Sequence, residues 1–148
     1  MLRLPEADAP PAPRVGGLLA AYVVVHAILI LHGLGLTLAA LIVNAHPSLG
    51  GLDEPKPWSH IAFYVATNVV LAVYSAVLIR LILARRRSAI VHNGIWAILT
   101  VVFLVTWHVL GMKSQIGVVV DSLPGLVGTL YLARSSRVKK TLVTRRVS

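Results

Sequence analysis

Four long apolar runs, separated by short polar connections, dominate this chain. They cover residues 15–43, 60–84, 90–112 and 116–133. At about 1.5 Å of rise per helical residue, runs of this length cross a hydrocarbon core about 30 Å thick. The pattern therefore predicts an all-α fold, an integral membrane four-helix bundle.

The composition agrees with a lipid environment. Of the 148 residues, 57% are hydrophobic and 13% are charged, whereas soluble domains usually carry about 25% charged residues. The connections between the runs are too short to hold a core of their own, so no separate soluble domain is expected. Cysteine is absent, which excludes disulfides, thiol catalysis, iron–sulfur clusters and c-type haem attachment.

The basic residues gather on one side of the predicted topology. Twelve of the 14 Lys and Arg residues lie before the first run, at the end of the second run or after the fourth, and only Lys56 and Lys113 lie on the other side. Such a bias marks the cytoplasmic side of a membrane protein. Both termini are therefore expected to be cytoplasmic, together with the turn at Arg85–Arg87.

Three segments follow from this reading of the chain. Residues 1–14 are expected to be a disordered, Pro/Ala-rich cytoplasmic lead, residues 15–134 the four-helix domain, and residues 135–148 a basic cytoplasmic tail. In the tail we expect a helix along the lipid headgroups, with Val138 and Leu142 dipping inward to dock on lipid or on a partner.

The basic residues near the cytoplasmic side have one expected role in common. They contact the anionic headgroups of the bilayer or a partner's cytoplasmic face. No nucleic acid is expected as a partner, because the chain has no recognisable reader fold. The residues are Arg85, Arg86, Arg87, Arg134, Arg137, Lys139 and Lys140.

Asp121 is the only acid inside the four runs. A carboxylate at the centre of a membrane helix costs roughly 2.5–3.5 kcal/mol on insertion scales. His108 lies at a similar depth on the preceding run, so the two side chains could meet and relay a proton. Alternatively, Asp121 is hydrated at the interface, or caps a helix start that Pro124 breaks.

His32 and Asn68 could extend this polar patch within the same half of the bundle. His32 and His108 could also ligate a b-type haem, although histidines in spans more often hydrogen-bond neighbouring helices. We expect neither a metal site nor a bound cofactor. Trp58 lies where an interfacial aromatic belt is expected, and the third run has Trp96 near its inner end and Trp107 near its outer end.

The end of the fourth run carries a family resemblance. Residues 131–142 read Tyr-Leu-Ala-Arg-Ser-Ser-Arg-Val-Lys-Lys-Thr-Leu, and the first run opens with Gly16-Gly17-Leu18-Leu19. These motifs resemble a family of small bacterial inner-membrane proteins catalogued as domain of unknown function 2569. Leu18 stands where that family tends to have Trp. The resemblance implies four helices in a bacterial inner (cytoplasmic) membrane with both termini cytoplasmic, and it supplies no reaction.

No complete catalytic set is present, so the chain is not expected to be an enzyme. The favoured function is a non-enzymatic accessory or scaffold subunit, packed against another membrane protein or against itself. One alternative is a proton-linked small transporter that uses Asp121 and His108. A second alternative is a haem b-binding electron-transfer subunit that uses His32 and His108.

Overall fold

The structure, a computed structural model, describes residues 17–50 and 54–142. Its elements are α1 (Leu18–Ala45), the short 3-10 helix η1 (Pro47–Gly50), α2 (Trp58–Leu83), α3 (Ser88–Val109), α4 (Gln115–Arg134) and α5 (Ser136–Thr141). Helices α1 to α4 are long and apolar enough to cross a membrane. The expected all-α four-helix bundle is confirmed, and it is the architecture of a small multi-pass membrane protein. The predicted lead, residues 1–14, and residues 143–148 of the tail lie outside the described residues.

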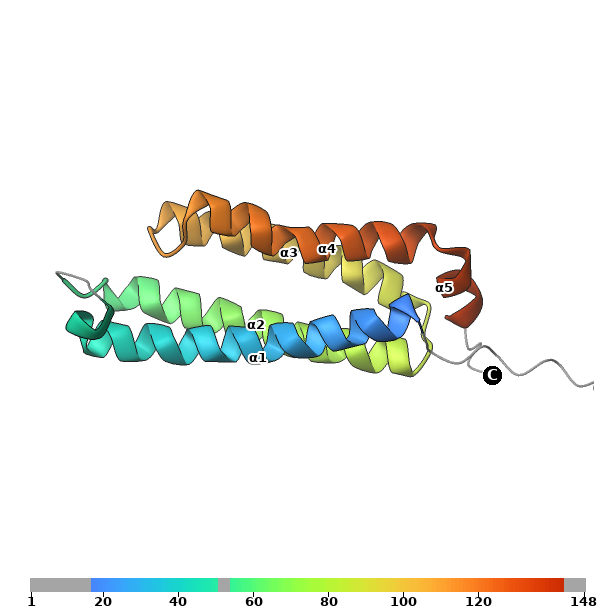
Figure 1. The fold of residues 1–148 in the computed structure, drawn as a ribbon, viewed down its shortest axis with the longest axis horizontal. Helices are drawn as coiled ribbons and strands as arrows, with labels where there is room; N and C mark the ends of the chain where they lie inside the picture. Colours follow the sequence, from blue (N-terminus) through green and yellow to red (C-terminus); the bar gives the residue numbers. More distant parts are fainter. Residues whose placement is uncertain (1–16, 51–53, 143–148) are drawn as a thin grey trace, which may run out of the picture.

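The bundle consists of two helical hairpins. Helix α1 packs along α2, α3 packs along α4, and the hairpins meet mainly where α2 contacts α3. Helices α1 and α4 make few contacts with each other. The two hairpins therefore lie close at one end and diverge toward the other (Figure 1).

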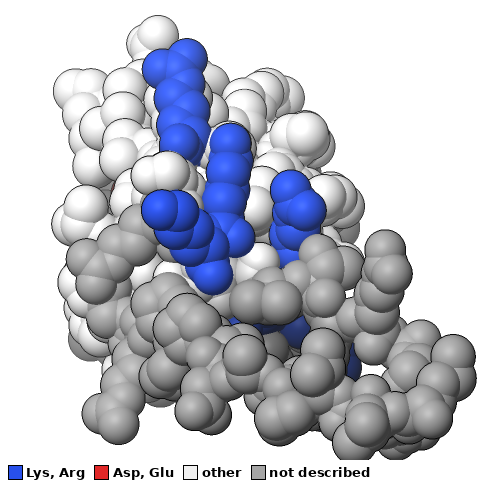
Figure 2. Space-filling model, turned by 90° about the vertical axis from the view of Figure 1, so that its right-hand side faces the viewer, with Lys and Arg blue, Asp and Glu red and all other residues white. Residues whose placement is uncertain are grey.

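The end where the hairpins meet is also the end where the basic residues gather. We call it the basic end: it holds the start of α1, the turn between α2 and α3, and α5. The opposite end holds the connection between α1 and α2 and the turn between α3 and α4. Lys and Arg side chains stand out on the basic end (Figure 2).

Tight turns end two of the long helices, α2 at the basic end and α3 at the opposite end. At the opposite end, Gly111 adopts a φ of 66°, and the amide of Met112 donates to the carbonyl of Trp107 over 2.8 Å. At the basic end, Arg85 occupies the equivalent position in the turn after α2, with a φ of 54°. This left-handed position usually holds glycine. The turn at Gly111 explains why α3 ends at Val109 and not at the expected Met112.

Helix α5 closes the basic end of the bundle. After Ser135 the chain turns, and α5 lies across the ends of the long helices (Figure 1). Val138 and Leu142 are buried and pack against Leu19, Ile82 and Leu132. Their apolar face therefore docks on the bundle itself, and the expectation that it docks on lipid or on a partner is wrong.

A polar network joins three helices near the basic end. The Tyr22 hydroxyl on α1 donates to Oδ1 of Asn93 on α3, and Nδ2 of Asn93 donates to Oγ1 of Thr129 on α4 over 2.9 Å. Asn93 is completely buried. His26, also completely buried, lies between the rings of Tyr22 and Trp96, with centroid distances of 4.6 and 4.7 Å. These contacts hold α1 to the second hairpin.

Candidate functional site

A cavity separates the two hairpins where they diverge. It has a volume of ≈ 200 Å³, and all four long helices contribute to its wall. Three of the four predicted intramembrane polar residues line it: His32 from α1, Asn68 from α2 and Asp121 from α4. The rest of the wall is mostly apolar and includes the rings of Trp96 and Trp107.

The cavity is open along the line between α1 and α4. We call this line the seam and define it by His32 on α1 and by Val120 and Asp121 on α4. The His32 side chain is exposed, Val120 is 54% exposed, and the Asp121 side chain is 36% exposed. Within the described residues, the seam therefore leaves one polar side chain exposed and a second partly exposed at bilayer depth.

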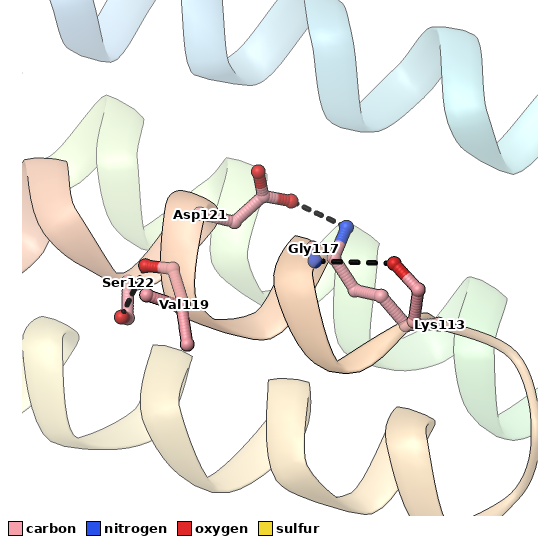
Figure 3. Close-up of polar contacts among 6 residues, drawn as sticks. Lys113, Gly117, Val119, Asp121 and Ser122 are labelled. Atoms are coloured by element: carbon pink, nitrogen blue, oxygen red, sulfur yellow. Dashed lines mark hydrogen bonds and ion pairs between the residues drawn. The ribbon is translucent and has the colours of Figure 1, made fainter.

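Asp121 forms an ion pair with Lys113 (Figure 3). Lys113 precedes α4, and its side chain runs along the first turns of the helix toward the carboxylate. A lysine near a helix end usually extends toward the headgroups, so this inward direction reflects attraction to the acid. The pair lowers the cost of placing Asp121 in a membrane-spanning helix.

His108 does not join this site. Its Nδ1 lies 2.9 Å from the carbonyl oxygen of Lys113, on an exposed part of the last turn of α3, and His108 does not line the cavity. Among residues 17–50 and 54–142, the only ion pair that Asp121 forms is with Lys113. The candidate contact between His108 and Asp121 is therefore not formed, because similar depth does not make two helices turn those side chains toward each other.

Asn68 contributes to the site as a buried amide. Its Nδ2 donates to the carbonyl of Tyr64 over 2.9 Å, within α2. Its Oδ1 lies 3.5 Å from the place that a Cβ on Gly33 would occupy. Gly33 of α1 therefore lies in ordinary contact range of α2, and both Gly33 and the preceding residue, His32, line the cavity.

Trp96 and Trp107 were expected near the two membrane interfaces, but both are buried in the bundle. Trp107 donates its Nε1 to Oγ1 of Thr67 on α2 over 2.8 Å, which ties the two hairpins together. Nε1 of Trp96 is buried and has no hydrogen-bond partner within the described residues. A tryptophan near the end of an apolar run is typical of an interface, so sequence position alone did not indicate this role.

The basic residues of the predicted docking set occupy the basic end. Their chemistry suits anionic headgroups, and no acid of the described segments lies among them. The side chain of Arg137 lies outside the described part of the structure. Of the others, Arg85 is half-buried, and the remaining five are exposed: Arg86, Arg87, Arg134, Lys139 and Lys140.

No group of three or more His, Cys, Asp or Glu side chains that could hold a metal ion occurs within residues 17–50 and 54–142. The haem alternative needs His32 and His108 to face one space. His32 lines the cavity, whereas His108 lies outside it. The geometry does not bring the proposed axial ligands together.

The ion pair makes a direct prediction. We expect Lys113→Met to lower the free energy of unfolding by about 2 kcal/mol, which is below the full cost of an unpaired acid at a helix centre because Asp121 lies only about 9 Å along α4 from its first residue, Gln115. In an Asp121→Asn background the same change is expected to cost little. Unfolding in mixed detergent micelles measures both values, and equal losses in the two backgrounds would show that the pair carries no coupling energy.

No family model, no curated protein and no solved structure matches this chain. The resemblance to domain of unknown function 2569 therefore stays a prediction from its motifs. Function has to be argued from the cavity, the seam and the basic end.

Proposed function

We propose that this chain is a non-enzymatic accessory or scaffold subunit of a complex in a bacterial inner membrane. The uncovered seam between α1 and α4 is the observation that carries the proposal. Polar side chains in membrane helices favour positions where other helices pack, because hydrogen bonds and close contact drive association there. A protein helix that covers the seam would shield His32 and Asp121 from lipid.

The ion pair supports this proposal over the proton-linked carrier. A carrier needs an acid that gains and loses a proton during transport. Asp121 is instead held in an ion pair with Lys113 at the start of the same helix. The pair therefore favours a structural role for Asp121.

Native mass spectrometry tests the proposal. The tagged chain is extracted gently from its own host membrane, and a chain with both His32→Leu and Asp121→Leu serves as the seam variant. We expect a defined complex for the unaltered chain and loss of the partner subunit from the seam variant. An unaltered chain that appears only as a bare monomer would contradict the proposal.

The proposed orientation places both termini and the basic end in the cytoplasm, where Lys and Arg flank membrane helices and contact anionic lipids. Because the chain has no native cysteine, single cysteines report orientation cleanly. A membrane-impermeant maleimide added to intact cells is expected to label Leu49→Cys, an exposed position in η1, and to spare Lys140→Cys until the membrane is opened. The reverse labelling pattern would contradict the orientation.

A further inference from the structure

His32 and Asp121 lie at equal depth on the two sides of the seam. By helical rise, His32 lies about 20 Å along α1 from its first residue, Leu18. Asp121 lies about 20 Å along α4 from its last residue, Arg134. Both helices have these ends at the basic end of the bundle, so the two groups are at one level in the membrane.

The two groups are chemically complementary but do not meet within one chain. An imidazole N–H can donate to a carboxylate oxygen. No nitrogen of His32 lies within 4.0 Å of a carboxylate oxygen of Asp121 in the described part of the chain. One carboxylate oxygen, Oδ2, contacts Lys113, and the side chain leaves α4 on the side that faces α1 (Figure 3). A lipid tail in the seam would provide neither group with a partner.

Extending the proposed function, we propose that a second copy of this chain covers the seam. A two-fold axis along the bundle places α1 of each copy against α4 of the other. His32 of each copy then faces Asp121 of the other at the same depth, so two identical contacts form. Gly35, close to His32 on α1 and with nothing within 4 Å of its Cβ position, allows the second backbone to approach closely.

Cysteine cross-linking in liposomes tests this arrangement. One tagged version of the chain carries Ile28→Cys, an exposed position on α1 one turn before His32, and a second version with a different tag carries Val120→Cys. The two versions are reconstituted together at low protein density and treated with a short bismaleimide. Because each chain has a single cysteine, every cross-link joins two copies. The expected result is a mixed product that exceeds both same-residue products.

Val102→Cys is the matched control for Val120→Cys. By helical rise, Val102 lies about 20 Å along α3 from Ser88, and Val120 lies about 20 Å along α4 from Arg134, so their depths agree. Their exposed fractions are 52% and 54%. A mixed product no more abundant than the one formed with Val102→Cys would overturn the proposal. Fluorescence energy transfer gives a second measurement, between unaltered chains that carry a donor tag and others that carry an acceptor tag at the C-terminus. Absence of energy transfer would also overturn the proposal.

The two contacts themselves are tested by His32→Leu. Losing two membrane hydrogen bonds, at about 2.8-fold in affinity each, is expected to weaken dimerisation about eightfold. Unchanged dimerisation would overturn the assigned contact. If Val120 cross-links to a different protein in host membranes while the mixed product is absent in liposomes, the accessory function stands and the second copy is excluded.

Discussion

Gly128→Val is expected to lower the free energy of unfolding by about 2–3 kcal/mol, through overpacking of a tight helix contact. A Cβ at Gly128 would lie 2.6 Å from Cζ of Tyr22. Tyr22 cannot move freely, because its hydroxyl donates to the buried Asn93 and its ring contacts His26. If Tyr22 moves to make room for the valine, its hydrogen bond to Asn93 breaks, and the network between α1 and the second hairpin is lost.

Gly94→Val is the matched control for this change. Gly94 lies inside α3, and nothing lies within 4 Å of its Cβ position. The same substitution there changes helix propensity without a clash. Unfolding in mixed detergent micelles compares the two variants, and equal losses would show that the contact between Gly128 and Tyr22 does not hold the hairpins together.

Leu142→Ala is expected to destabilise the basic end by about 2–5 kcal/mol, the usual range for a buried leucine replaced by alanine. Leu142 is 1% exposed and packs with Val138 against the ends of the long helices. Its loss leaves a void beneath α5 and should release the helix from the bundle. Hydrogen exchange measures the release, as faster exchange of amides in residues 136–142.

Lys140→Ala is the control for the α5 prediction, because Lys140 is exposed on the same short helix. It should leave both stability and exchange nearly unchanged. If Leu142→Ala also leaves exchange unchanged, α5 does not depend on the bundle for its order. The expectation from sequence, in which Val138 and Leu142 face lipid or a partner, would then be restored.

The sequence predicted the long helices because membrane spans depend on length and hydropathy, which are local properties. It also identified three polar residues of the cavity, since His32, Asn68 and Asp121 stand out against apolar neighbours. The sequence could not predict that these three side chains line one cavity, because the rotation of each helix about its axis depends on packing between helices that are distant in sequence.

The errors have the same origin. Similar depth made His108 a candidate partner of Asp121, whereas Lys113 reaches the carboxylate along the start of α4. Docking of α5 was misassigned because an amphipathic pattern is equally suited to a membrane surface and to the end of a bundle. Asn93, which joins three helices, gave a usable signal as an amide within an apolar run, but its partners are separated from it by 71 and 36 residues.

Photocross-linking in host membranes shows whether a protein covers the seam between α1 and α4, on which the proposed function depends. A benzoyl-phenylalanine replaces Val120 on the seam or, as the control of equal depth and exposure, Val102 on α3. We expect a discrete protein adduct at residue 120 and lipid adducts alone at residue 102. Lipid adducts alone at both positions would contradict a covered seam.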